Sequence, residues 1–492
     1  MRHFRDNPDQ SPAQSTRAYA RGRPKAALAG AFLAAALVVL PAPRSLAADA
    51  GTEKAGAAGA SAIAARLVDQ GGKAHLVFEL TAPVEASAHV VANPDRIIVD
   101  LPEVAFRIDP NIGRTRETAG KQAAGGGKLA DGLVKSYRFG LLATGRSRVV
   151  IDLARPAKIL EAASVTLESG ARLAIDLAAT DAASFAAAAE HARALPAPSP
   201  AQDLVIPAPA PAADSDKPLV VIDPGHGGVD VGAASKHGEL EKTIVFEFAR
   251  ALKAKIEEKG RLRAELTRTD DVFVALDDRV RFARKRNAAL FLSIHADTLG
   301  EPHVEGATVY TVSARASDAE AAKVAASENR ADQAAGLERK EDAEDIGDIL
   351  LDLARRETRA YSRQFAQALV SKWGDAGSLN KNPSRSAGFV VLKAHDVPSV
   401  LLELGYLSSE KDRAKLISPE WRERAAASTA QAIEDYFSAR GQTPPTPRQS
   451  AQAGFGGAPT IKHKSGSVER PAKTPARKKT PARKRRGGSR SK

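Results

Sequence analysis

The second half of the chain alternates short apolar runs with segments of helical periodicity. Apolar residues dominate 219–222, 290–294 and 400–402, and each run leads into polar or glycine-containing residues, as buried strands often do. Apolar residues then recur every four positions from Ile244 to Ile256, which predicts a helix with one stripe against a sheet. Strands that alternate with helices predict an α/β domain over residues 218–440, with a mixed or parallel twisted sheet flanked by helices.

Residues 58–180 carry a different pattern, in which apolar and polar positions alternate. One unit of an arginine, three apolar residues, an aspartate and a leucine occurs three times, at 96–101, 148–153 and 172–177. On a strand, alternate residues share a face, so each arginine lies on the same side as its aspartate and can pair across neighbouring strands. Further strand candidates are 74–80, 85–91 and 134–139. These short strands predict a small all-β sandwich that precedes the α/β domain.

The first 48 residues have the layout of a secretory signal peptide. Basic residues between Arg17 and Lys25 precede an apolar run at 26–40, and Ser45-Leu46-Ala47 supplies a small-residue cleavage site. This run is shorter than the roughly 20 residues that a membrane span needs. We therefore expect an exported, periplasmic protein whose mature form starts near Ala48. An uncleaved membrane anchor is the alternative.

Charge and composition divide the rest of the chain. The net charge is +13, yet residues 461–492 hold thirteen Lys/Arg and one Glu (+12), and residues 1–48 hold seven Lys/Arg and two Asp (+5), which leaves −4 for 49–460. Residues 181–217 are rich in Ala and Pro and predict a linker. There is no cysteine, so disulfides, thiolate metal ligands and a lipid-modified cysteine are excluded.

The last segment, 441–492, predicts a disordered basic tail, because repeated Pro-Ala-Arg-Lys units offer nothing to bury. For an exported protein we expect such a tail to bind an anionic wall polymer or an anionic membrane surface, and we expect no nucleic-acid partner. A solvated tail without a dedicated partner is the alternative.

Candidate chemistry gathers where the predicted strands of the α/β domain end. His226, His295 and Glu403 each follow or end an apolar run, and Glu241 opens the predicted helix. In open α/β sheets, ligands bind beyond the carboxyl ends of the strands. Two histidines and a glutamate are a ligand set that catalytic zinc uses, and a further glutamate can act as the base of a hydrolase. Taken singly, each residue is also explained by a turn, a helix start or a surface position, and Glu239 is an alternative ligand to Glu241.

Four segments in this order carry a family resemblance: 221–228 (Val-Ile-Asp-Pro-Gly-His-Gly-Gly), Glu241-Lys242, 293–297 (Ser-Ile-His-Ala-Asp) and 402–405 (Leu-Glu-Leu-Gly). Together they resemble the zinc-dependent N-acetylmuramoyl-L-alanine amidases. The resemblance implies one Zn²⁺ per chain, held by His226, Glu241 and His295, with Glu403 as the catalytic acid/base. Secondary signatures of the same family further suggest substrate or supporting roles for three residues: Arg268, Asn287 and Lys393.

The resemblance also implies the substrate. These enzymes cleave the amide between the lactyl group of N-acetylmuramic acid and L-alanine, which releases stem peptides from peptidoglycan. Without the family resemblance, the residues predict only a zinc hydrolase that acts on an amide or an ester. Two alternatives stay open: a zinc peptidase or deacetylase with the same metal set, and a non-catalytic wall-binding protein that keeps the fold.

The segment 93–102 resembles the AMIN domain, a module that precedes such amidases and is linked to peptidoglycan and septal targeting. A sandwich that only spaces the catalytic domain is the alternative. Residues 313–361 form a charged helical insertion that resembles the division-associated members of the family, in which a helix covers the zinc until a LytM-type activator displaces it. We therefore expect a role in septal wall splitting during cell division. The candidates for the residue that blocks the zinc are Glu328, Glu338, Glu341 and Glu344, and a solvated helical pair is the alternative to a lid.

Overall fold

The computed structural model describes residues 59–114, 132–194, 217–301, 303–337 and 349–441, without the side chains of 349–353. The predicted signal peptide, most of the predicted linker and the basic tail beyond residue 441 lie outside these residues, as do Glu338, Glu341 and Glu344. By their internal contacts, the described residues between 59 and 441 belong to one unit. In the described part of the chain, no helix has both the length and the apolar composition of a membrane span.

Two antiparallel sheets form the predicted sandwich. A five-stranded sheet has the order β5-β1-β2-β9-β8, and a four-stranded sheet has the order β3-β4-β7-β6. The only parallel pair in the sandwich sheets, over the described residues, is β1 with β5. The strands are β1 (Ala60–Gln70), β2 (Lys73–Leu80), β3 (Ser87–Val91), β4 (Arg96–Pro102), β5 (Val104–Phe106), β6 (Val134–Ala143), β7 (Arg146–Leu153), β8 (Ala157–Leu167) and β9 (Gly170–Ala179).

The arginine and aspartate residues of the first two repeated units face each other as the alternation predicts. In the register of β4 and β7, Asp100 lies opposite Arg148, and Arg96 lies opposite Asp152. Arg148 donates to both carboxylate oxygens of Asp100, at 2.7 and 3.0 Å. The intervening apolar residues on the other face, such as Ile97 and Val149, are buried in the core between the two sheets. The all-β domain predicted before the α/β domain is therefore confirmed.

The start predicted for the linker, residue 181, is wrong. Residues Ala182–Ala194 form the helix α1, which packs against β3 and buries Phe185 and Ala189 in the core of the sandwich. Alanine is the strongest helix former, and this segment is mostly alanine with no proline. The first of the linker prolines comes only at Pro196, so the alanine-rich part belongs to the folded domain.

The α/β domain contains one mixed sheet of the order β11-β10-β12-β15-β13-β14. Its strands pair in parallel except that β13 runs antiparallel to β15. The central strands β10, β12 and β15 are buried along their whole length, as expected for strands covered on both faces. The strands are β10 (Leu219–Pro224), β11 (Arg263–Leu266), β12 (Leu290–His295), β13 (Ala307–Val312), β14 (Leu379–Ala387) and β15 (Ser399–Glu403).

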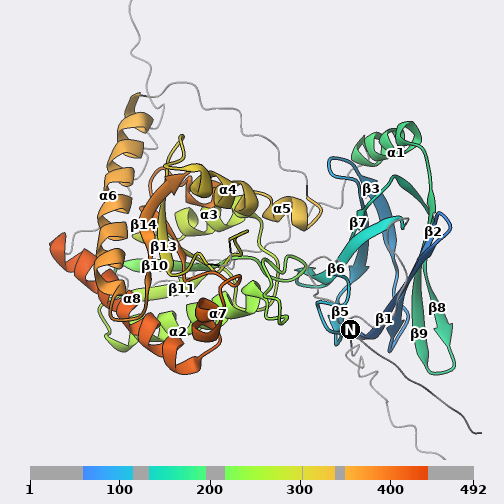
Figure 1. Cartoon of the computed structure of the whole chain (residues 1–492), viewed down its shortest axis with the longest axis horizontal. Coiled ribbons are helices and arrows are strands. Elements are labelled where there is room, and N and C mark those ends of the chain that lie inside the picture. The colour runs from blue at the N-terminus through green and yellow to red at the C-terminus, as the bar shows by residue number, and fades with distance from the viewer. Residues whose placement is uncertain (1–58, 115–131, 195–216, 302, 338–348, 442–492) are drawn as a thin grey trace, which may run out of the picture. The chain divides into compact units, whose positions relative to one another are not determined.

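Helices cover both faces of this sheet (Figure 1). On one face lie α2 (Glu241–Glu258), α6 (Ile349–Trp373) and α8 (Pro419–Ala439), whose apolar residues share a core with the strands. On the other face lie α3 (Leu276–Lys285), α4 (Ala319–Glu328) and the 3₁₀ helix η3 (Val390–Leu392). Two short helices, α5 (Ala331–Ala334) and α7 (Glu410–Leu416), complete the domain. The predicted α/β architecture is confirmed, with α2 beginning at Glu241 as its apolar stripe indicates.

A buried ion pair lies at the carboxyl end of β10. Asp223 is fully buried and accepts hydrogen bonds from Arg279 Nη1 at 2.8 Å and from the hydroxyls of Thr267 and Ser293 at 2.6 and 2.7 Å. Burial alone would raise the pKa of Asp223, but Arg279 and the two hydroxyls hold that pKa below its usual value. The carboxylate therefore stays charged and ties β10, β11, β12 and α3 together.

Arg279 uses its remaining donors on the backbone that follows β10. Its Nη1 donates to Pro224 O at 3.0 Å, its Nη2 to His226 O at 2.9 Å, and its Nε to Val274 O at 2.9 Å. The guanidinium is 2% exposed, so water does not compete for these contacts.

We predict that Arg279→Gln lowers the free energy of unfolding by about 3–5 kcal/mol, because it leaves Asp223 as an uncompensated buried charge. Urea denaturation of the metal-free protein measures the change. Lys285→Gln is the matched control, since Lys285 is exposed on the same helix and should alter stability by less than about 0.5 kcal/mol. Equal effects of the two substitutions would contradict a role for the ion pair.

Candidate metal centre

The loop after β10 brings His226 to the edge of the sheet in an unusual backbone conformation. His226 has φ of 57°, in the left-handed region that non-glycine residues seldom adopt. Its carbonyl is held by Arg279, which supplies a fixed partner for that conformation. A Cβ at Gly225 would collide with the ring of His295. Glycine at position 225 therefore allows the two histidines to approach each other, with ring centroids 5.0 Å apart.

Glu241 joins the two histidines from the first turn of α2. Its Oε2 lies 3.1 Å from His226 Nε2, and its Oε1 lies 3.2 Å from His295 Nδ1. The carboxylate also accepts the backbone amides of Ala233 at 2.8 Å and Ala296 at 2.9 Å, so both oxygens are held in place. The sequence left Glu239 as an alternative ligand.

Glu239 is directed elsewhere. It accepts hydrogen bonds from Ser235 Oγ and from Arg413 Nη1, the latter at 2.5 Å. The geometry of the cluster therefore favours Glu241 over Glu239.

Strand register places Glu403 beside His295. The two residues lie directly opposite each other in the parallel pair of β12 and β15. Glu403 is fully buried, and its Oε2 accepts the amide of Asp297 at 3.1 Å. One oxygen of this carboxylate is therefore anchored, and the other, Oε1, is buried without a hydrogen-bond partner among the described residues.

Asp230 is a member of the site that sequence reasoning missed. Its Oδ2 lies 2.9 Å from Nδ1 of His226, and the aspartate is buried. Metal-binding histidines commonly donate their second ring nitrogen to a carboxylate, which orients the ring and fixes its tautomer. Asp230 would orient His226 in this way, so that Nε2 faces Glu241. The signal in the sequence was an aspartate four residues after the histidine.

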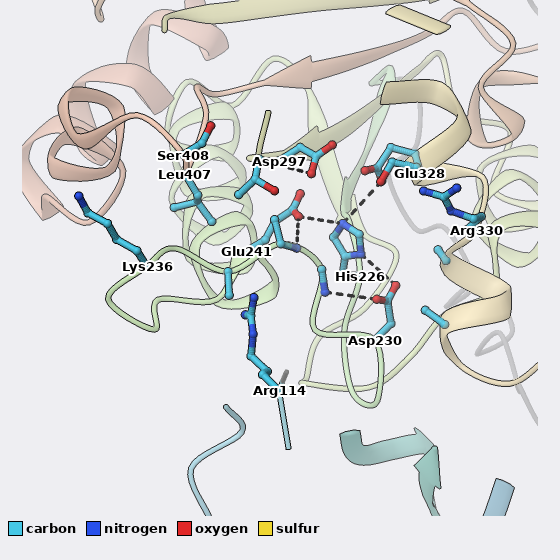
Figure 2. A pocket seen from close by; sticks show the side chains of 17 residues that line it. Arg114, His226, Asp230, Lys236, Glu241, Asp297, Glu328, Arg330, Leu407 and Ser408 are labelled. Atoms are coloured by element: carbon cyan, nitrogen blue, oxygen red, sulfur yellow. Dashed lines mark hydrogen bonds and ion pairs between the residues drawn. The ribbon is translucent and has the colours of Figure 1, made fainter. Parts of the chain in front are cut away.

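Glu328, at the end of α4, also reaches the cluster (Figure 2). Its Oε2 lies 3.0 Å from His295 Nδ1 and 3.6 Å from His226 Nε2, and its side chain is 6% exposed. Of the four glutamates that the sequence offered for this position, Glu328 is the one in the described part of the chain, and the structure brings it to the histidines.

The electrostatics of the cluster are dominated by carboxylates. Burial works against a charged ring at His226, but Glu241, Asp230 and Glu328 outweigh it and hold the pKa of His226 well above its usual value. Burial also opposes the charged ring of His295, yet Glu328 and Glu241 raise its pKa to about 10. Both imidazoles are therefore protonated at neutral pH when no metal is bound.

In two further carboxyl groups the raised pKa favours the neutral form. Burial, with Glu328 and Glu241 nearby, raises the pKa of Asp297 to about 8. Burial is also the main cause that raises the pKa of Glu403 well above its usual value. The site therefore holds more buried carboxyl groups than its own cations can keep ionised, and a bound cation would relieve this excess.

The donor set fits a zinc ion. One ligand atom from each of His226, Glu241 and His295 lies within 4.8 Å of the others, and all three residues are buried. Ligands at about 2.0–2.2 Å from a tetrahedral zinc are separated by roughly 3.3 Å, close to the 3.1 and 3.2 Å between Glu241 and the two imidazoles. Apart from its ion pairs with Glu241 and Glu328, His226 Nε2 is buried without a hydrogen bond of regular geometry among the described residues, as a metal-binding nitrogen would be.

The three residues predicted to support the substrate or the site have different surroundings. Arg268 is buried and donates to the carbonyls of Pro224, Gly225 and Lys242, at 2.9–3.1 Å. It therefore braces the loop that carries His226. Its position is that of a supporting residue.

Asn287 and Lys393 are not brought to the site. Asn287 has φ of 52° just after α3, where a left-handed residue ends a helix, and its side chain is exposed. Lys393 is exposed after η3. Neither lines the cavity beside the histidines. The predicted roles of these two residues therefore stay predictions.

A cavity of about 570 Å³ opens beside His226 and Glu241. Cationic side chains at its wall include Lys236, Arg330 and, from the sandwich, Arg114 (Figure 2). Burial lowers the pKa of Arg114 from its usual value, yet an arginine remains charged at neutral pH. The cavity therefore combines a carboxylate-rich floor with a cationic rim, which suits a substrate that carries carboxylate groups.

Comparison with known proteins gives a consistent result. Residues 220–435 match the Amidase_3 family, described as N-acetylmuramoyl-L-alanine amidase. The chain is 36% identical over 227 residues to the N-acetylmuramoyl-L-alanine amidase AmiC of Escherichia coli, which covers 46% of this chain and 54% of that protein. It is 37% identical over 222 residues to AmiA of Salmonella typhimurium, which covers 45% of this chain and 76% of that protein.

Among solved structures, the N-acetylmuramoyl-L-alanine amidase AmiC2 of Nostoc punctiforme is 28% identical, with a TM-score of 0.33, over 46% of this chain and 99% of that one. The chain thus spans about half the length of the AmiC relative and about three quarters of the AmiA relative.

We predict that zinc binding at pH 7.5 releases about two protons, one from each imidazole, because the imidazole nitrogen that binds zinc must be deprotonated and both rings have raised pKa values. Since those protons compete with the metal, zinc affinity should fall as the pH falls. Calorimetric titration in buffers of different ionisation enthalpy measures the number released. His237→Gln is the control, because His237 is an exposed histidine near the site and its loss should leave the count unchanged. A count near zero would show that the rings are neutral before zinc binds.

Proposed function

Because the chain belongs to the N-acetylmuramoyl-L-alanine amidase family, we propose that it hydrolyses the amide bond between N-acetylmuramic acid and L-alanine in peptidoglycan. The observation that carries the proposal is the buried cluster of His226, Glu241 and His295 with Glu403 opposite His295 on the neighbouring strand. A ligand set and a separate carboxylate are what hydrolysis of an unactivated amide requires.

Each residue of the cluster has a distinct role in this proposal. Zn²⁺ held by His226, Glu241 and His295 would supply a water of lowered pKa and a Lewis acid for the amide carbonyl. Glu403 would take a proton through its unpartnered Oε1 and return one to the leaving nitrogen of L-alanine. Its raised pKa suits both steps, since a carboxyl group with a pKa nearer neutrality exchanges protons readily.

Two competing functions are less well supported. A non-catalytic wall-binding protein has no need of a buried base, yet Glu403 is fully buried at a cost in desolvation. A zinc peptidase or deacetylase would use the same donor set, and only the reaction product separates it from an amidase.

We further propose that residues 319–337, here called the lid segment, close the site in the resting protein. Glu328 Oε2 is 3.0 and 3.6 Å from the two imidazoles, which are separations that a fourth zinc ligand would have. In this position the carboxylate would exclude both the reacting water and the substrate carbonyl. An activator that binds the open form would have to favour it by about 10⁴-fold to reverse a strongly closed equilibrium.

The biological setting follows from the same proposal. We infer that the protein is exported to the periplasm, where a LytM-type activator would release the lid segment during septal wall splitting. The sandwich would act as an AMIN domain that binds peptidoglycan or the division site. The basic tail would hold the protein to an anionic wall polymer or membrane surface.

We predict that the zinc-loaded protein releases stem peptides from purified sacculi with a new free amino group on L-alanine, identified by mass spectrometry. Glu403→Gln should retain zinc and lower the rate by about 10²–10⁴-fold, because it removes the acid/base group but no metal ligand. His295→Ala is the contrasting variant and should lose both zinc and activity. New termini within the stem peptide would identify a peptidase instead, and release of acetate would identify a deacetylase.

The lid proposal predicts that Glu328→Gln raises the basal rate of sacculus hydrolysis, by roughly tenfold or more, because a neutral amide is a much poorer zinc ligand than a carboxylate. Glu320→Gln is the control, since Glu320 lies on the same helix and pairs with Arg385 instead of the histidines. A rate unchanged in Glu328→Gln, with zinc still bound, would argue against a closed resting state.

A further inference from the structure

Three arginines of the sandwich converge on the lid segment. Arg138 Nε donates to Ala334 O at 2.7 Å, and Arg148 Nη1 donates to Ala335 O at 2.9 Å. Arg96 Nη1 donates to Gln333 O. The three acceptors are consecutive carbonyls at the end of α5, where a helix leaves its last carbonyls without i+4 partners, although Gln333 O also accepts the amide of Gly336 at 2.9 Å. We call Arg96, Arg138 and Arg148 the arginine face.

The arginine face is held rigid by the sheet that carries it. Arg148 is 4% exposed and forms two hydrogen bonds with the carboxylate of Asp100. Arg138 Nη1 lies 2.5 Å from Asp152 Oδ2. Because these pairs fix the guanidinium groups before they meet α5, little side-chain entropy is lost in the contact.

An apolar contact surrounds these hydrogen bonds. Ile98 and Val150 lie on the same side of β4 and β7 as the arginines and are both fully buried. They share an apolar cluster with Ala335 and Leu337 of the lid segment, and with Val229 and Phe273 of the α/β domain. A Cβ at Gly336 would collide with Ile98, which shows how closely the lid segment approaches the sheet.

The contact is coupled to Glu328 through a short connection. Only Asn329 and Arg330 separate α4, which ends at Glu328, from α5. Within the lid segment, the amide of Leu337 donates to Asp332 O at 2.9 Å, and Asp332 Oδ1 accepts the amide of Leu276 at 3.0 Å. A displacement of α5 would therefore be transmitted to the end of α4 that carries the glutamate.

We propose that the sandwich clamps the lid segment shut, with the arginine face gripping the end of α5 and thereby keeping Glu328 at the histidines. The proposal rests on the lid function proposed above. It assigns to the sandwich a regulatory role within the chain, in addition to any binding of the cell wall. The segment that the arginine face binds is residues 331–337 of the same polypeptide.

The repeated unit of the sandwich supplies a matched control. Its first two copies place Arg96 and Arg148 on the sheet that meets α5, whereas the third places Arg172 on β9 of the other sheet, exposed to solvent. The same chemical change can therefore be made inside and outside the clamp.

The experiment compares basal sacculus hydrolysis of the full-length protein with that of Arg138→Gln/Arg148→Gln and of Arg172→Gln. We expect the double variant to be roughly tenfold faster, which corresponds to about 1.4 kcal/mol of closed-state stability, and Arg172→Gln to be unchanged. Hydrogen exchange should show faster exchange of the amides of residues 331–337 in the double variant alone. Ala335→Arg is a second test from the lid side, because it forces a large cation against Arg148 and leaves the sandwich sequence intact.

The outcomes separate this proposal from the lid function. If Glu328→Gln is activated while the double variant and Ala335→Arg are not, the lid stands and the clamp is wrong. If none of the three is activated, the lid function fails and the clamp fails with it. Equal activation by Arg172→Gln would attribute the effect to general loosening of the sandwich and would overturn the clamp.

Discussion

The buried ion pair of Asp223 and Arg279 is the interaction on which the rest of the site depends. Asp223 gathers an arginine and two hydroxyls from three other elements, and Arg279 passes the constraint to the carbonyls of Pro224 and His226. The positive φ of His226 is maintained by that contact. Because a broken buried pair leaves a charge unsatisfied, the arrangement is held far more firmly than a surface loop would be.

The penalty for an uncompensated buried charge also applies to the metal site, whose folded state is less stable when no cation is bound. Five buried carboxyl groups, at positions 230, 241, 297, 328 and 403, lie around two imidazoles. Burial and mutual repulsion raise the pKa values of Asp297 and Glu403, and attraction to the carboxylates raises the pKa of His226 although burial opposes it. When no metal is bound, the two protonated imidazoles supply the positive charge that the carboxylates need. Attraction between these rings and the carboxylates holds together the loop, the helix and the strand that carry them.

Much of this arrangement was accessible from the sequence, because strand ends and helix starts have local signatures. The apolar runs before His226, His295 and Glu403 predicted three neighbouring strand ends, and the stripe after Glu241 predicted where α2 begins. Asp230 and Asp297 were missed, since nothing local shows that a carboxylate will face a histidine. Long-range packing also brings Glu328 to the histidines, whereas its three competitors lie outside the described residues. Asn287 and Lys393 were chosen from motif resemblance, and both are exposed.

The sandwich illustrates the same limit. The repeated unit predicted β4, β7 and β9, but β1 is rich in alanine and β8 carries exposed apolar residues such as Leu160 and Val165, so neither shows a clear alternation. One signal of the contact with the lid segment was present in the repeats. Beside the arginine, the first two copies carry Ile98 and Val150 on the outward face, where the third carries Ala174. Large apolar residues on an outward face indicate that something covers it.

The pairing of His295 with Glu403 across two parallel strands has a consequence for how such an enzyme can change. Neighbouring strands are about 4.8 Å apart, and backbone hydrogen bonds maintain this spacing whatever the side chains are. The sheet thus fixes the separation between the backbones of the proposed metal ligand His295 and the proposed proton acceptor Glu403. Loops, lid and sandwich can be exchanged, lengthened or removed at the rim while that separation stays constant. Substrate specificity and regulation can therefore change, while the backbone keeps the geometry of the chemical step constant.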